Sequence, residues 1–294
     1  NSNFNYNFNS NFNSNFNSNF NSNFNSNFNS NFNSNVDVDK NGDGNDVNNN
    51  GEIYINNEKF NFPLVLKQPT GQGGLNIKIA KNFNDFNEYL DKFDNILCEE
   101  FIEGSEISIE VLSFKNQFFP IVPVYKGETT LDGIHPIKRK RSAPVKIDDL
   151  DNDYIKKIAI TIAKALNSEG VIDIDFIYSK KNKTLYVLEI NTRPSGTRYL
   201  SYSATLISPL IEIVKMGINK FSVEELNSKI KDYYSLEIPV GNYNGIFLEK
   251  NPKEFIKNSW VVHGPKNYQR LTISGENKEI AYKIANKLLK NFKE

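Results

Sequence analysis

The 294-residue sequence has a single cysteine, Cys98, which excludes a disulfide framework and a cysteine-based metal site within the chain. It has two histidines and a formal net charge of +0, so no basic excess points to nucleic acid. No apolar run approaches the about 18 residues that a membrane span needs. The first residues also lack the basic and apolar segments of a signal peptide. We therefore expect a cytoplasmic protein with neither nucleic acid nor membrane as a partner.

The first 35 residues form a low-complexity repeat in which Asn stands at every odd position, with Ser, Phe or Tyr between. Such tracts are disordered alone and prone to cross-β association. Self-association through the tract is one hypothesis, and an expanded tract without a dedicated role is the simpler one. An Asn/Asp/Gly-rich linker follows at residues 36–58.

From about Lys59 the composition becomes globular and predicts an α+β protein, because strands and helices alternate without a strict βαβ repeat. Strands are predicted at 62–67, 96–102, 106–114, 171–177 and 184–190, with an extended segment at 118–125 whose prolines suggest a sheet edge. Helices are predicted around 86–93 with Asn84 as cap, around 155–166, after Ser208 and after Ser222. Short strands and a last helix are expected in 237–294.

A predicted hairpin carries acidic residues at one end. Side chains alternate between the faces of a strand, so Asp173 and Asp175 share one face of the first strand. Glu189 and Asn191 likewise share one face of the second. A turn centred on Asn182 puts Asp175 opposite Glu189, where two carboxylates would destabilise the hairpin unless a cation lay between them. Oxygen ligands of these types suit Mg²⁺ bound together with phosphates, and a solvated outer face of the sheet is the alternative.

Lys67 ends an apolar strand directly before the Gly-rich loop 69–74. A charge at the end of a buried strand needs a partner, and glycines let backbone N–H groups approach phosphate oxygens. The loop matches neither the Walker spacing nor GxGxxG, and a plain turn is the alternative. Arg193 and Arg198 follow the acidic hairpin, and guanidinium groups bind phosphate in a bidentate way. Together these features favour a site for a nucleotide phosphate.

Four segments in this order resemble the ATP-grasp superfamily. VLKQPTGQGG is similar to the strand and flexible loop that bind the phosphates, and LCEEFIEGSEISIEV is similar to the hinge strand that holds adenine between two lobes. DIDFI and LEINTRPSG resemble the magnesium-binding strands. The resemblance covers about residues 59–220. Within the family, the large subunit of carbamoyl phosphate synthase looks closest in layout, and general carboxylate–amine ligases share much of it.

The resemblance implies an ATP-grasp fold in which two α+β lobes grip ATP. The small lobe would span about 59–103 and the large lobe about 104–220, followed by a C-terminal α/β extension at 221–294. ATP would be bound by Lys67, Gln72, Gly73, Gly74, Glu99, Glu100, Phe101, Ile102 and Glu106. Magnesium, with Mn²⁺ as an alternative ion, would be bound by Asp175, Glu189 and Asn191, and Asp173 competes for the place of the first ligand.

The resemblance also implies that Arg193, Arg198 and His135 face the transferred phosphate as catalytic residues. For His135, a turn residue between a glycine and a proline is the alternative. The basic run 138–141 has a solvated strand or a localisation-type basic tract as alternatives. Because side chains alternate along a strand, at most two members of that run can reach one site.

The implied reaction has two steps. A carboxylate or bicarbonate attacks the γ-phosphate of ATP, and an amine or ammonia then displaces phosphate from the acyl phosphate. Family members carry a further domain before the ATP-grasp fold, whereas Asn repeats stand there in this sequence, which does not begin with Met. We therefore expect a truncated chain, and an ATP- and magnesium-binding module without turnover is the alternative to an active ligase.

Overall fold

The computed structural model describes residues 61–68, 76–92, 96–132, 138–242 and 255–289 in full, and elsewhere the backbone of the strands between residues 36 and 60 and of Asn95. The predictions for the Asn-rich repeat 1–35 lie outside the described residues. So do those for Gln72, Gly73, Gly74 and His135. Within the described part of the chain, no helix is long and apolar enough to cross a membrane.

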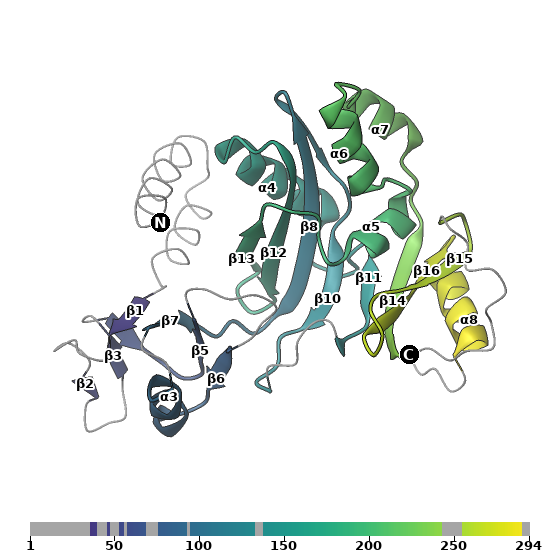
Figure 1. Ribbon diagram of the computed structural model, residues 1–294. Coiled ribbons are helices and arrows are strands. Elements are labelled where there is room, and N and C mark those ends of the chain that lie inside the picture. Colours follow the sequence, from purple (N-terminus) through teal and green to yellow (C-terminus); the bar gives the residue numbers. More distant parts are fainter. Residues whose placement is uncertain are drawn as a thin grey trace.

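The N-terminal lobe contains a four-stranded antiparallel sheet with one helix packed on it (Figure 1). The strand order is β1 (Val36–Asp39), β7 (Asn95–Glu100), β5 (Leu64–Lys67) and β6 (Lys78–Ala80), and the helix is α3 (Phe83–Leu90). Leu64, Leu66 and Cys98 are buried against α3. The helix begins two residues earlier than predicted, because the side chain of Asn82, and not Asn84, accepts the first-turn N–H. A separate small sheet contains β2 (Asp46–Val47), β3 (Ile53–Ile55) and β4 (Glu58–Phe60).

A nine-stranded antiparallel sheet forms the second lobe (Figure 1). Its order is β13 (Thr184–Asn191), β12 (Gly170–Ser179), β8 (Ser105–Phe114), β10 (Val124–Glu128), β11 (Arg141–Ala143), β14 (Tyr234–Gly241), β16 (Gln269–Gly275) and β15 (Ser259–His263), with β9 (Gln117–Pro120) paired to β8. The predicted edge segment 118–125 is wrong in part. Only its first half is β9, whereas β10 lies inside the sheet between β8 and β11, since both prolines fall outside β10.

Helices cover both faces of this sheet and leave a polar band on one of them. Alternate residues of β8 and β12, among them Ile109 and Ile174, are buried against α4 (Asn152–Ala165). On the same face, Leu236 of β14 packs on α8 (Lys278–Leu288). The other face carries α5 (Arg198–Thr205), which the sequence did not predict and whose Leu200 packs with Leu112. The polar residues of β8 and β12 lie on the same face of the sheet as α5 and form the polar band.

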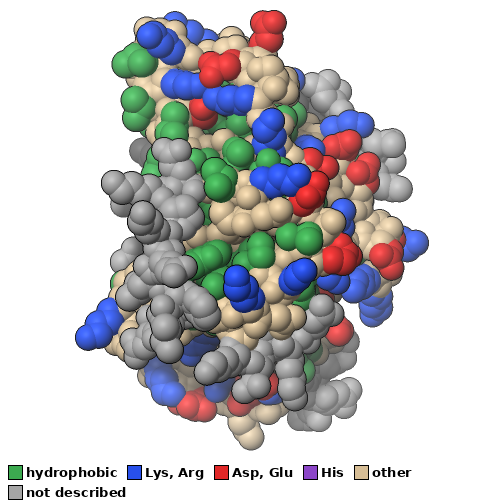
Figure 2. Space-filling model, turned by 90° about the vertical axis from the view of Figure 1, so that its right-hand side faces the viewer, with side chains coloured by type: hydrophobic (Ala, Val, Ile, Leu, Met, Phe, Trp, Pro, Cys, Tyr) green, Lys and Arg blue, Asp and Glu red, His purple; other side chains and the backbone are tan. Residues whose placement is uncertain are grey.

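The described residues of the C-terminal part, 221–242 and 255–289, contribute strands to the same sheet. The helices α6 (Pro209–Gly217) and α7 (Val223–Lys229) lead into β14, which pairs with β11 through Arg141 and Glu237. On the side of the molecule shown in Figure 2, basic and acidic side chains are interspersed, in keeping with the formal charge of +0. Apolar side chains are also exposed, and Val214 on α6 is 64% exposed.

Candidate active site

The acidic hairpin has the predicted register where the metal ligands are expected. Asp175 pairs with Glu189 and Asp173 pairs with Asn191. A β-bulge produces this alignment, because Phe176 pairs with Val187 and an unbroken register would place Leu188 opposite Asp175. The bulge therefore brings the carboxylates of Asp175 and Glu189, on neighbouring strands, opposite each other.

Asp175 is buried, and its two oxygens differ in their surroundings. Lys126 Nζ lies 2.7 Å from Oδ2. Oδ1 is shielded from solvent and has no hydrogen-bond partner in the structure. Buried carboxylate oxygens are normally paired, so this oxygen is available to a further cation. Across the hairpin, Glu189 is exposed and accepts a hydrogen bond from Asn191 Nδ2 at 3.0 Å.

These residues fit a magnesium ion by their chemistry. Two carboxylates and an amide oxygen are hard ligands, and Mg²⁺ is usually held by one or two protein carboxylates together with waters and phosphates. Among the described residues, no three His, Cys, Asp or Glu side chains gather as an all-protein metal cage. An open site of this kind agrees with an ion that arrives together with a nucleotide.

Asp173, the competing ligand, is already engaged on one side. Ser108 Oγ donates to its Oδ1 at 2.6 Å, and Arg193 Nη1 lies 4.0 Å from its Oδ2. Burial raises the pKa of Asp173 well above its usual range, and the neighbouring charge of Asp175 raises it further. Since Asp175 has the unpartnered oxygen, the geometry favours Asp175 as the ligand.

Five of the expected ATP-binding residues lie on β5, on β7 or on the connection from β7 to the large sheet. Lys67, at the end of β5, forms an ion pair with Glu99 of β7, both on one face of the small sheet. Glu100 ends β7 and is exposed. The chain then leaves the small sheet. Phe101 N–H donates to Pro63 O, which precedes β5, and Ile102 O accepts from Thr129 Oγ1, which follows β10 of the large sheet. The structure thus places the segment 99–102 at the passage from β7 to the large sheet, with Lys67 on the neighbouring strand.

Glu106 begins the polar side of β8. Its carboxylate forms an ion pair with Arg139 at 2.8 Å, and both side chains are 13% exposed. Burial raises the pKa of Glu106, and Arg139 opposes this rise. Arg139 and Arg141 of the basic run both carry buried ion pairs, the second with Glu237, so neither is part of a solvated strand.

The two arginines predicted to face the phosphate differ in how firmly the structure holds their side chains. Arg193 is 58% exposed and bends back to its own neighbour Pro194 O. Arg198 begins α5, and its Nη1 donates to Ser195 O at 3.1 Å. Both flank Ser195, which is 2% exposed. The segment 193–198 is therefore fixed at its centre, Ser195, and its two guanidinium groups lie near the polar face of the sheet.

Glu110 of β8 anchors that segment, and the sequence reading missed it. It is 1% exposed, and it accepts from Ser195 N at 2.9 Å and from Ser201 Oγ at 2.6 Å. Ser195 Oγ in turn is 2.8 Å from Thr197 Oγ1. The alternation of Glu106, Ser108 and Glu110 along β8 was a usable signal, because it places all three on the face of the site.

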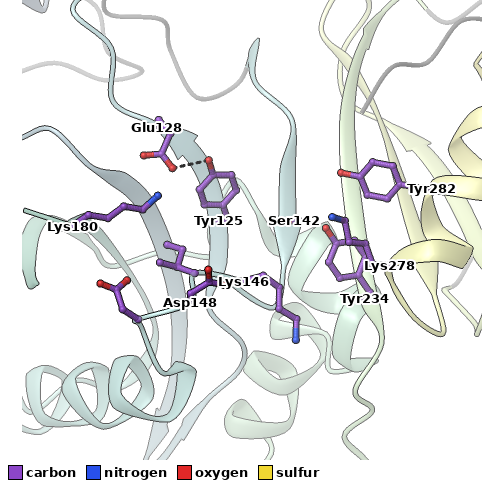
Figure 3. A pocket seen from close by; sticks show the side chains of 11 residues that line it. Tyr125, Glu128, Ser142, Lys146, Asp148, Lys180, Tyr234, Lys278 and Tyr282 are labelled. Atoms are coloured by element: carbon purple, nitrogen blue, oxygen red, sulfur yellow. Dashed lines mark hydrogen bonds between the residues drawn. The ribbon is translucent and has the colours of Figure 1, made fainter.

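A pocket of about 580 Å³ lies elsewhere, beside α8 (Figure 3). Tyr125, Tyr234, Tyr282 and Lys146 line it, and Tyr125 Oη donates to Glu128 at 2.9 Å. Its volume would suit a small molecule. None of the residues predicted for nucleotide, metal or phosphate lines it, and it opens on the face that carries α4 and α8. The candidate active site is therefore the polar band of the opposite face.

The fold and the order of the motifs define an ATP-grasp domain. A family model described as an ATP-grasp domain matches residues 52–197, and the chain belongs to the ATP-grasp superfamily. Its sequence is 48% identical over 221 residues to a carbamoyl-phosphate synthase of Methanobrevibacter smithii, covering 75% of this chain and 60% of that protein. It is 26% identical over 189 residues to a D-alanine–D-alanine ligase B of Clostridium tetani, covering 58% and 52%.

Solved structures share the fold. Biotin carboxylase of Campylobacter jejuni, in complex with β-γ-ATP, aligns with a TM-score of 0.59 at 18% identity, covering 78% of this chain and 57% of that one. N5-carboxyaminoimidazole synthetase of Staphylococcus aureus, complexed with ADP, aligns with a TM-score of 0.60 at 16% identity, covering 77% and 61%. These likenesses confirm the α+β ATP-grasp fold. The chain spans 60% or less of the length of the curated relatives named here.

Proposed function

We propose that the chain is an ATP- and Mg²⁺-dependent ligase. It activates a small-molecule carboxylate, or bicarbonate, as an acyl phosphate for attack by an amine or ammonia. The proposal rests above all on the unpartnered Asp175 Oδ1, which lies across the hairpin from Glu189 beside a segment that carries two arginines. Membership of the ATP-grasp superfamily and the 48% identity to a carbamoyl-phosphate synthase support it.

In this proposal Asp175, Glu189 and Asn191 hold Mg²⁺. Bound there, the ion would supply charge neutralisation to the phosphate oxygens. Lys67 would exchange its ion pair with Glu99 for a contact with the ATP phosphates, over which Gln72, Gly73 and Gly74 would close. The backbone from Glu99 through Glu100 and Phe101 to Ile102 would line adenine, and Glu106 would hold the ribose hydroxyls.

The arginines supply the remaining positive charge. Arg193, Arg198 and His135 would face the transferred phosphate. Glu110 anchors Ser195, and Arg198 Nη1 donates to Ser195 O, so the guanidinium group of Arg198 is oriented before the reaction. The chain's residues thereby act by binding and orienting the two substrates. No nucleophilic side chain is needed, because the carboxylate of the substrate attacks the phosphate itself.

An ATP- and Mg²⁺-binding module without turnover is the second candidate, because the residues assigned above would contact ATP, the metal or phosphate, and none is assigned to the carboxylate or the amine. The two are separated by phosphate release from Mg-ATP in the presence of pooled carboxylates, amino acids, ammonia and bicarbonate. Release that requires both a carboxylate and an amine supports the ligase. Binding of Mg-ATP without release under every condition supports the module.

The metal assignment is tested with Glu189→Gln, which removes the charge of one ligand and keeps its shape. Calorimetric titration should show Mg-ATP affinity reduced by about 100-fold. Glu224→Gln, at an exposed position of α7, is the matched control and should bind as the parent does. Equal Mg-ATP binding by the parent and Glu189→Gln would refute the assignment.

A further inference from the structure

Lys126 reaches the candidate metal site because β10 contains a β-bulge. Tyr125 pairs with Ile107 and Gly127 pairs with Glu106, so Lys126 is an extra residue in the ladder. Gly127 has φ +107°, a backbone conformation that favours glycine. Bulges re-aim side chains and recur beside active sites. Here the bulge directs the lysine onto the polar face.

The lysine is buried together with its partner. Its Nζ lies 2.7 Å from Asp175 Oδ2, and the two side chains are 13% and 8% exposed. Its charge also acts on neighbouring carboxylates. Burial raises the pKa values of Asp173 and Glu106, and Lys126 is among the groups that oppose this rise. One ammonium group thus compensates a cluster of acids that would otherwise repel one another.

We propose that Lys126 is a positioning residue that couples magnesium binding to nucleotide binding. It holds the Asp175 carboxylate in place and opposes the approach of Mg²⁺ alone, and it yields to the metal when ATP phosphates offer the ammonium group a new partner. This rests on the proposed function for the identity of the ligands and adds a role for a residue outside that set.

The physical reason is competition between two cations for one carboxylate. Mg²⁺ takes oxygen ligands at about 2.0–2.1 Å and leaves its hydration shell reluctantly. An ammonium ion 2.7 Å from the other oxygen of the same group repels the incoming ion in a poorly solvated site. The negative charge of the triphosphate removes this conflict. Because coupling between two binding sites is thermodynamically reciprocal, Mg²⁺ and ATP must each increase the affinity of the chain for the other through this lysine.

A lysine that served only to neutralise a buried acid would behave differently on removal. Breaking a buried ion pair leaves an uncompensated charge and disturbs its surroundings, so a purely structural lysine predicts weaker or unchanged metal binding in its absence. The coupling role predicts the opposite sign. Metal binding without nucleotide becomes tighter when the competing charge is gone.

The test is calorimetric titration of the nucleotide-free full chain with MgCl₂ at about pH 8, where carboxylates are ionised. Lys126→Met should bind Mg²⁺ about tenfold more tightly than the parent, which corresponds to about 1.4 kcal/mol. The enhancement of Mg²⁺ affinity by ATP should shrink by the same factor. Lys126→Gln, which is neutral but can still donate a hydrogen bond to Asp175, should show the same tighter Mg²⁺ binding. It replaces Lys126→Met in the test if the methionine variant does not fold.

Two controls surround this measurement. Lys126→Arg keeps the charge and should keep the parent's affinity for Mg²⁺. Lys229→Met removes a lysine that pairs with a buried carboxylate, Glu212, away from the site, and should change nothing in the titration. Equal or weaker Mg²⁺ binding by both neutral variants overturns the proposal for Lys126. Failure of the parent to bind Mg²⁺ even with ATP overturns the proposed function as well.

Discussion

Glu237→Gln is expected to lower the free energy of unfolding by about 3–5 kcal/mol, because it removes the negative charge from a buried cationic cluster. Glu237 is 0% exposed. Its Oε1 accepts from Arg270 Nε at 2.5 Å and from Arg141 Nη1 at 3.4 Å. Its Oε2 accepts from Thr272 Oγ1 at 3.1 Å and lies 3.3 Å from His263 Nε2. The substitution removes the negative charge that both buried guanidinium groups contact.

The shift in the pKa of Glu237 gives a similar magnitude for the loss of unfolding free energy. Burial by itself raises this pKa, but the His263 hydrogen bond and the charges of Arg270 and Arg141 outweigh burial and lower it from 4.5 to about 2. At about 1.4 kcal/mol per pKa unit, the carboxylate contributes about 3 kcal/mol. The folded-state pKa lies below the unfolded one. The contribution is therefore complete above about pH 4.5 and is lost as the pH falls toward 2.

Urea unfolding followed by circular dichroism measures the effect. With a urea slope of about 2–3 kcal/mol/M, the midpoint at pH 7 should fall by about 1–2 M. Glu225→Gln is the matched control, since Glu225 also has two cationic partners, Lys215 and Lys229, but is 49% exposed. Exposed pairs of this kind contribute about 0–1 kcal/mol. Equal midpoints for the two variants would refute the reasoning, as would a gap between parent and Glu237→Gln that does not narrow below pH 4.5.

Two further predictions concern single buried groups. Glu110→Ala should reduce the rate of phosphate release by at least about tenfold while Mg-ATP affinity stays near that of the parent, because it removes the hydrogen bond to Ser195 N and leaves the metal ligands in place. Ser113→Ala, a control that changes a buried polar residue on the opposite face of β8, should leave the rate unchanged. Equal rates in the two variants would contradict the anchoring role of Glu110. Cys98 should not react with a thiol reagent in the folded chain and should react fully in denaturant, since burial raises its pKa to about 12; rapid labelling of the native protein would contradict its buried position.

The local elements and the acidic hairpin could be predicted because their determinants are close in sequence. Apolar periodicity defined α4, and the Ser222–Glu225 pair located the start of α7. The short turn between β12 and β13 allows only antiparallel pairing, so Asp175 and Glu189 could be placed together without coordinates. The ATP-grasp fold followed from ordered motifs, and the fold neighbours confirm it.

Other parts depended on contacts that local patterns do not contain. The helix α5 was missed because its buried face is largely hydroxyl-bearing. Ser201 donates to Glu110 and Ser203 hydrogen-bonds with Ser235, both in the sheet. The edge assignment of 118–125 failed in its second half, because β11 pairs with the side of β10 that faces away from β8. Buried polar residues that hydrogen-bond one another leave no apolar periodicity in the sequence from which their burial could be predicted.

The sequence by itself determined which residue types line the candidate site and in which order they come, because side-chain alternation and short turns act over a few residues. The tertiary structure decided which charges meet. Two β-bulges, at Leu188 and Lys126, set the alignment of Glu189 with Asp175 and the contact of the lysine with that carboxylate. Arg141 and Glu237 pair across 96 residues of chain. Such contacts arise only when strands from distant segments are packed side by side, where a low local dielectric makes the identity of each neighbour decisive.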